Sequence, residues 1–570
     1  MPRLRPLPPP HPKLVVRIGV TGHRRPNQLP RDTSQLEGAV TRVLDYVRSL
    51  AEEVARPGGG YEGEPRLVLV SPLAEGADRL VARIATDRKY ELEVPLPFAE
   101  DEYLKDFRSA RSKAEFRALR EQAESVLELD GRRDPPGERG NGGVEDLAYA
   151  RAGSVVIQNS EVVLAVWNGT INHKVGGTGE VVAEALRQQV PVVQVPTQAP
   201  HEPVLVDAIT RNGVRTRPLE DLAKLLLGTL ERPSTPDHPW YFRRIPILGW
   251  SPPLHLWFRK LLGVRTSAAG SEPSPKPAWS DFHWADALAN FYGNFYRSAY
   301  VTVYLLGAVA VWLALLSLHE AVFAEIELAV IAAIMLVILA GRYGHWHDRW
   351  LNHRLLAEQF RQAELLVPLG RTGAWFRGLV APLTERPGEP WTTWLFRARV
   401  REARLAHTSL TGEELEGYRA RLLDVISAQR TYHENNHKAL ERLEHRLHGL
   451  GTLLFILTFF ACVLHLAAGS VFPEVAREAW EYRLVVFAAV FPALGGALAA
   501  IASHGEFRRI ARRSEAMANR LRALEQRAQG LRNPTSDEAA EVAESATQLM
   551  TAELLDWHVM LLERPLVLPG

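Results

Sequence analysis

Cysteine is almost absent from this 570-residue sequence, which contains only Cys462. One thiol cannot form an intramolecular disulfide or a cysteine-based zinc site. The sequence also has no excess of charge of either sign, because 67 lysines and arginines balance 66 aspartates and glutamates. This balance gives no reason to expect binding to nucleic acid, so we predict no nucleic-acid partner.

The N-terminal segment lacks the apolar core that a secretion signal needs. Residues 1–13 are rich in proline and lead directly into a short apolar strand. We therefore predict a disordered tail, followed by a first domain that stays in the cytoplasm.

Four segments of the second half have the apolarity of membrane-spanning helices, which need about 20 residues. They cover about residues 296–318, 328–340, 447–468 and 484–502. The second has a short apolar core. It either spans a tilted or thinned region or forms a buried hairpin arm inside an oligomer.

The charged residues beside these segments predict their orientation. The loop between the first two segments contains Glu320, Glu325 and Glu327 but no lysine or arginine. Basic residues instead follow the second and fourth segments and precede the third. The positive-inside rule therefore places both short loops outside, and the N- and C-termini in the cytoplasm.

The same plan occurs twice in this half, because each predicted hairpin is followed by a long charged helix, at 346–366 and 507–528. Small residues in the fourth span, Gly495 and Gly496 among them, allow close helix packing. We expect a homo-oligomer in a lipid bilayer. The predicted segments are a Pro/Trp-rich linker at 231–280, a first hairpin with cytoplasmic helices at 281–430, and a second hairpin with C-terminal helices at 431–570.

A five-residue segment, His433 to His437, matches HExxH, the pattern that can place two imidazoles on one zinc ion. The match lies in a very polar helix before the third span and lacks a clear third ligand. We interpret it as a solvated stalk and predict no metal site.

Residues 14–230 alternate short apolar runs with amphipathic helices, the pattern of a Rossmann-like α/β domain with a parallel sheet. Strands are expected at 14–20, 67–70, 92–97, 162–166 and 192–195. The predicted fold is therefore an α/β domain fused to an all-α transmembrane domain of two hairpins.

Three polar clusters follow predicted strands, where open α/β sheets bind ligands. Glycines let backbone amides approach an anion, and a helix N-terminus favours phosphate. The clusters comprise Thr21, Gly22, His23 and Arg24; Glu75, Gly76, Ala77 and Asp78; and Gly176, Gly177, Thr178 and Glu180. Their spacing matches neither the Walker loop nor GxGxxG, so P-loop ATP hydrolysis and ordinary NAD dehydrogenase chemistry are unsupported.

The Thr-Gly-His-Arg and Glu-Gly-Ala-Asp turns, together with the run from Leu164 through Trp167 and Gly169 to Thr178, resemble the SLOG superfamily. This group contains Rossmann-like nucleotide-binding domains related to LOG enzymes, DprA and the sensor domain of TRPM channels. The resemblance covers about residues 14–200 and implies that Trp167 and Gly169 join the ligand-binding set.

The paired hairpins, with Trp350, Arg354 and Glu358 on the helix after the first, resemble SLATT two-helix membrane effectors of bacteria. This combination implies a bacterial antiphage effector in the inner membrane. The SLOG domain would sense a nucleotide second messenger or ADP-ribose-like ligand, and the hairpins would open a pore. No other cofactor is expected.

The sequence departs from LOG enzymes at one motif. Their Gly-Gly-x-Gly-Thr-x-x-Glu pattern, placed on Gly176, requires Thr where Glu180 stands and Glu where Ala183 stands. A sensor is therefore favoured over an enzyme. Two alternatives remain: a membrane-anchored nucleotide hydrolase or phosphoribohydrolase using Glu180 or Glu184, and a membrane-tethered scaffold.

Overall fold

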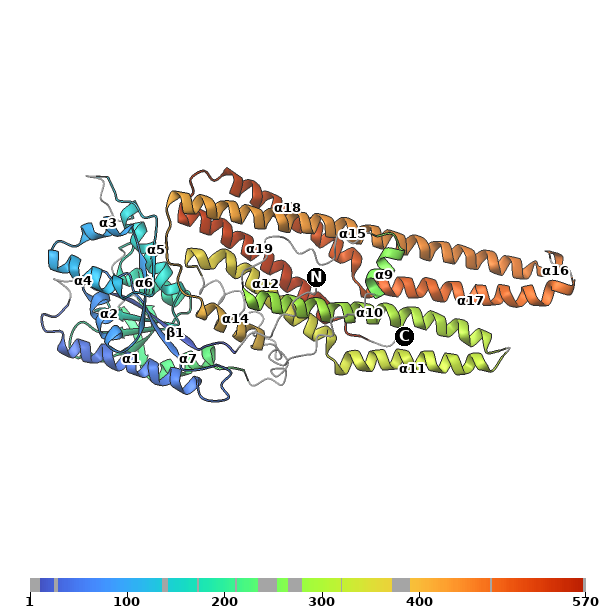
Figure 1. Ribbon diagram of the computed structural model, residues 1–570, viewed down its shortest axis with the longest axis horizontal. Coiled ribbons are helices and arrows are strands. Elements are labelled where there is room, and N and C mark those ends of the chain that lie inside the picture. The colour runs from blue at the N-terminus through green and yellow to red at the C-terminus, as the bar shows by residue number, and fades with distance from the viewer. Residues whose placement is uncertain are drawn as a thin grey trace, which may run out of the picture.

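The computed structural model of the chain describes residues 11–24, 29–135, 142–171, 174–210, 213–233, 254–264, 279–318, 320–371, 390–471 and 474–566 (Figure 1). Most of the predicted N-terminal tail and most of the predicted linker lie outside these residues. The described chain forms an N-terminal α/β domain followed by a helical region, which confirms the predicted fold class.

The sheet of the α/β domain has nine strands in the order β8-β7-β6-β5-β1-β2-β3-β4-β9. Strands β1 to β6 and β9 pair in parallel, whereas β7 and β8 add an antiparallel edge. The strands are β1 (Val15–Gly22), β2 (Arg66–Val70), β3 (Glu91–Leu96), β4 (Ser125–Glu128), β5 (Val162–Val166), β6 (Val192–Val195), β7 (Val204–Thr210), β8 (Gly213–Pro218) and β9 (Thr408–Ser409).

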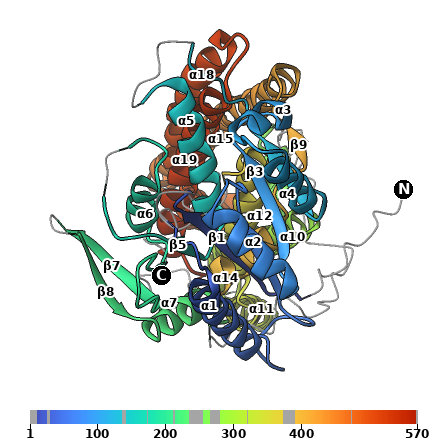
Figure 2. The ribbon, with the colours of Figure 1, turned by 90° about the vertical axis from the view of Figure 1, so that its left-hand side faces the viewer.

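Helices cover both faces of this sheet because its central strands are apolar on both sides. One face packs against helices α1 (Ser34–Val54), α2 (Ala77–Asp87), α4 (Ala110–Glu121) and α7 (Asp221–Leu230). The other packs against α5 (Val144–Gln158) and α6 (Thr178–Arg187). Figure 2 views this domain end-on, with the helical region behind it.

The helical region consists of long helices that extend away from the sheet (Figure 1). They are α9 (Leu254–Leu261), α10 (Ser280–Leu316), α11 (Val322–Tyr343), α12 (Trp346–Leu366), α14 (Pro390–Glu402), α15 (Gly412–Leu466), α16 (Ala468–Val471), α17 (Glu474–His504), α18 (Phe507–Gly530) and α19 (Ser536–Leu562). Among the described helices, α10, α11, α15 and the stretch that begins in α17 are long and apolar enough to cross a membrane. The chain therefore has the features of a membrane protein.

The apolar surface of these four helices faces outward. Leu336 is 69% exposed, Phe455 72% and Phe459 62%, and water would solvate such a surface poorly. Helix α11 has 22 residues, so the short second apolar segment extends into a helix long enough to span. Both hairpin tips lie at the end of the molecule far from the sheet (Figure 1).

The two regions share one hydrophobic core. Leu127 of β4 and Val155 of α5 cluster with Leu366 of α12, Leu410 beside β9 and Ala540 of α19. Strand β9, which follows the first hairpin in sequence, also completes the edge of the sheet by pairing with β4. The α/β domain and the helical region are therefore joined by shared hydrophobic packing and by a strand of the helical region that pairs with the sheet.

Candidate functional site at the carboxyl edge of the sheet

The first two polar clusters meet where β1 ends. The backbone N–H of His23 donates to the Val166 carbonyl at 3.1 Å, and its carbonyl accepts from Ala77 N at 3.1 Å. A side chain at Gly22 would overlap Ala77 and approach the Val166 carbonyl to 2.8 Å. Glycine is therefore required here, because it lets the N-terminus of α2 pack directly against the end of β1.

The second turn is shaped by a buried arginine. Leu73 adopts a left-handed conformation with φ 55, and the guanidinium of Arg79 donates to its carbonyl at 3.0 Å. Gly76 follows with φ 107 and precedes the first turn of α2. The N-terminus of α2 therefore lies at the sheet edge, where the helix dipole favours an anion.

The third cluster joins the first through Tyr149 of α5. Gly176, with φ 70, packs so closely on α5 that a side chain there would lie 2.8 Å from the Tyr149 Cβ. The guanidinium of Arg24 lies 5.0 Å from the centre of the Tyr149 ring. Arg24 is exposed, so its charge is available to a ligand at this edge. Residues from all three predicted clusters therefore lie together.

Asp106 and Arg133 extend the site, and the motifs did not predict them. Asp106 accepts from the Tyr149 hydroxyl and pairs with Arg133 at 2.7 Å. Arg133 also pairs with Glu145 at 2.9 Å and lies over the Phe98 ring at 4.2 Å. These residues come from separate loops and helices, so no local spacing in the sequence connects them.

Asp78, in the first turn of α2, is the buried carboxyl group of the site, with 5% of its surface exposed. Burial raises the pKa of Asp78 to about 7, although the Arg24 charge and a hydrogen bond from Ala74 N oppose the shift. A carboxyl group with this pKa exchanges a proton near neutral pH.

The two glutamates considered as acid/base groups have structural partners. Glu180 accepts from the backbone N–H of Gly176 at 2.5 Å and so closes its own turn. Glu184 lies one helical turn further along α6 and bonds to Arg187 and Gln188. Burial would raise the pKa of Glu184, but these hydrogen bonds outweigh it and lower the pKa.

The remaining predicted residues differ in exposure. The Trp167 ring is fully buried in the core, and its Nε1 donates to the Thr170 carbonyl at 3.1 Å. Gly169 has φ 82, a conformation that glycine adopts without strain. Thr178 begins α6, and Glu75 is half-buried beside Gly76. Trp167 therefore supports the site from within, whereas the others lie at the edge.

Residues of the HExxH segment have different structural partners. Glu434 pairs with Arg430 and Arg522, each at 2.8 Å, and His437 contacts the Ala511 carbonyl at 3.1 Å. Across the described part of the chain, no group of three His, Cys, Asp or Glu side chains is placed to hold a metal ion.

The fold and site define an α/β domain with a glycine-rich, cation-bearing strand edge, joined to a helical region with four candidate spans. No family model, curated protein or solved structure matches this chain.

Proposed function

We propose that this protein is a nucleotide-sensing membrane effector, in which a nucleotide-derived anion at the carboxyl edge of the sheet opens an oligomeric pore. The resemblance to SLOG and SLATT proteins supports this reading, with an ADP-ribose-like molecule as the ligand class. It also supports a location in a bacterial inner membrane, and the distribution of basic residues around the spans supports placing both termini in the cytoplasm.

The observation that carries the proposal is the double role of α5. At the ligand edge this helix provides Tyr149, which contacts Gly176 and Arg24. Along the same helix, Arg151 pairs with Asp537 at the start of α19, and Ser154 accepts from Arg371 at 3.2 Å. A shift of α5 on ligand binding therefore acts directly on helices that lead to the spans.

Gating requires that the ligand bind the two states with different affinity. The Arg151–Asp537–Arg371 cluster is where such a difference would be transmitted, since Asp537 also pairs with Arg371 at 3.0 Å. Coupling free energies between sites are typically about 1–3 kcal/mol. The Arg151–Asp537–Arg371 cluster can therefore contribute a large share of the coupling free energy.

Liposomes that contain the full chain and a self-quenching dye test this function. ADP-ribose, NAD and cyclic nucleotides are added in turn, and mass spectrometry identifies any compound retained by the protein. We expect Asp537→Asn to reduce ligand-triggered dye release about tenfold and to change ligand affinity less than about twofold.

The control is Glu541→Gln, also on α19, which removes an exposed pair with Arg527 of α18. It should leave dye release unchanged. Release without any retained nucleotide would contradict the sensor, and retention without release would favour a scaffold.

Asp78 favours a second candidate, a nucleotide hydrolase. If the retained nucleotide loses its base or phosphate, the acid/base group we expect is Asp78 rather than Glu180 or Glu184, because its pKa of about 7 suits proton transfer. Asp78→Asn would then abolish turnover, whereas Glu184→Gln would not.

A further inference from the structure

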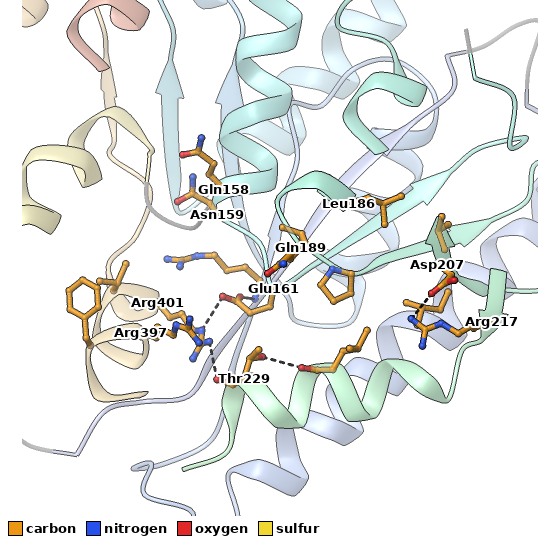
Figure 3. Close-up of a pocket in the computed structure, with 18 residues that line it drawn as sticks. Gln158, Asn159, Glu161, Leu186, Gln189, Asp207, Arg217, Thr229, Arg397 and Arg401 are labelled. Atoms are coloured by element: carbon orange, nitrogen blue, oxygen red, sulfur yellow. Dashed lines mark hydrogen bonds and ion pairs between the residues drawn. The ribbon is translucent and has the colours of Figure 1, made fainter. Parts of the chain in front are cut away.

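A cavity of about 450 Å³ lies at the opposite edge of the sheet, between the α/β domain and α14 (Figure 3). Arg17 near the start of β1, Glu161 before β5 and Pro191 before β6 place it at the amino ends of the parallel strands. Its other wall is α14, which belongs to the helical region. The volume is in the range of small-molecule sites, roughly 300–1,000 Å³.

Charged residues from both regions meet in this cavity. Glu161 accepts from the backbone N–H of Arg17 at 2.8 Å and pairs with Arg401 of α14 at 3.0 Å. Arg401 also donates to the Thr229 carbonyl at 3.2 Å, as Figure 3 shows. Four arginines and two carboxylates line the cavity, so cations are in excess.

One nitrogen of the Arg401 guanidinium indicates where an anion would bind. Arg401 is 8% exposed, and its Nη1 is buried without a hydrogen-bond partner among the described residues. A buried guanidinium N–H costs free energy unless an acceptor satisfies it, and oxyanions are its preferred acceptors. Nε and the other terminal nitrogen of Arg401 already donate hydrogen bonds, so Nη1 is the nitrogen that lacks an acceptor among the described residues.

Besides the uncharged polar residues Gln158, Asn159, Gln189 and Thr229, the lining contains an apolar wall. It includes Leu186 and Val190 at the end of α6, Leu205 of β7, Leu225 of α7 and Val400 of α14. A small inorganic anion would leave this wall in contact with water, whereas a molecule with an apolar body would cover it.

We propose that this cavity binds a small organic anion, with its phosphate or carboxylate on Arg401 and its apolar body against Leu186, Leu205 and Leu225. Such a ligand would contact both regions at once and fix α14 against the sheet. The site is distinct from the carboxyl edge, and the inference does not depend on the proposed function.

The probe is 1-naphthyl phosphate, with 1-naphthol and inorganic phosphate as comparisons, measured by equilibrium dialysis against the purified full chain. We expect saturable binding of naphthyl phosphate at least tenfold tighter than that of either comparison compound. Arg401→Gln should weaken it at least tenfold, because the free Nη1 is lost.

Since Arg401→Gln also leaves Glu161 without its partner, Leu225→Trp is a second test that fills the cavity and leaves every ion pair intact. It should weaken binding to the same extent. The matched control is Arg404→Gln, which removes an exposed arginine of the same segment that pairs with Glu124. Absence of saturable binding, or equal binding by wild type and both cavity variants, would overturn the proposal.

Discussion

The two hairpins of the helical region leave the membrane-spanning part through the same turn. Gly344-His345-Trp346 follows α11, and Gly505-Glu506-Phe507 follows α17. His345 and Glu506 are both left-handed, with φ 47 and 49. The hydrogen bonds also correspond: the glycine N–H donates four residues back, to Ala340 or Ile501, and the next N–H donates three residues back, to Arg342 or Ser503.

The helices after these turns differ in how they pack. On α18 one stripe is buried, comprising Ala511, Ser514, Met517, Ala518 and Leu521. The equivalent positions of α12 are buried too, and so is most of the rest of that helix. Helix α12 lies among α10, α14 and α19, whereas α18 packs on α15 and α19 and leaves an arginine-rich face exposed. A repeated local sequence therefore sets the turn, and tertiary contacts set the role of each helix.

The largest expected effect concerns the glycines of the two turns. A Cβ on Gly344 would overlap the Trp346 ring and lie 2.7 Å from the backbone oxygen of Ala340, whereas the three atoms nearest to a Cβ on Gly505 all belong to the Phe507 ring. A side chain can move aside but a backbone oxygen cannot. We expect Gly344→Ala to cost about 3 kcal/mol of stability and Gly505→Ala about 1 kcal/mol.

Thermal unfolding of the full chain in detergent measures the order of these two effects. Gly530→Ala at the end of α18 is the control, because nothing lies within 4 Å of the added atom. Equal losses from Gly344→Ala and Gly505→Ala would show that the two turns are equally adaptable.

His353 of α12 and Ser514 of α18 occupy equivalent positions after the two turns, but only His353 can take up a proton. Burial lowers the pKa of His353 to about 4, although a hydrogen bond to the Arg349 carbonyl opposes the shift. The folded protein therefore holds this histidine neutral, while the unfolded chain takes up a proton near pH 6.5. The contribution of neutral His353 to the free energy of unfolding is therefore fully present above pH 6.5. It declines as the pH falls towards 4, and about 2 kcal/mol of it is lost at pH 5.

Replacement of His353 by Gln keeps a donor for the Arg349 carbonyl and removes the titration. The unfolding temperature of this variant should fall less between pH 7.5 and pH 5 than that of the wild type. Ser514→Ala loses a hydrogen bond from Asn436 but contains no titrating group, so it should shift the whole curve without changing its slope. An unchanged slope for His353→Gln would refute the assignment.

The sequence predicted elements whose signal is local. Five strands were recognisable as apolar runs, and all five are present. Strands β4, β7 and β8 were missed: β4 has only four residues, and β7 and β8 form an antiparallel edge whose last strand carries exposed polar residues such as Arg215 and Arg217. Strand β9 has two residues and pairs with β4, about 280 positions away, so no window of sequence reveals it.

The candidate site likewise contains residues that the sequence predicted and residues that it did not. Glycine turns at Gly22, Gly76 and Gly176 were predictable, because backbone conformation is encoded in a few residues. The contacts of Asp106 with Tyr149 and Arg133 depend on how three separate segments pack. The Arg401 nitrogen that lacks a partner among the described residues lies at the junction of the two regions, so its own segment of sequence does not predict it.

The smallest expected effects concern the left-handed residues of the two turns. Asparagine tolerates this conformation better than histidine or glutamate, so His345→Asn should stabilise the protein by about 0.5 kcal/mol. Glu506 also pairs with Arg564 and is 13% exposed, so Glu506→Asn should lose about 1 kcal/mol despite the better backbone. Glu506→Gln removes the charge alone and separates the two contributions in thermal unfolding. If Glu506→Asn matched His345→Asn, the pair with Arg564 would contribute nothing, and the two turns would be equivalent in energy as well as in shape.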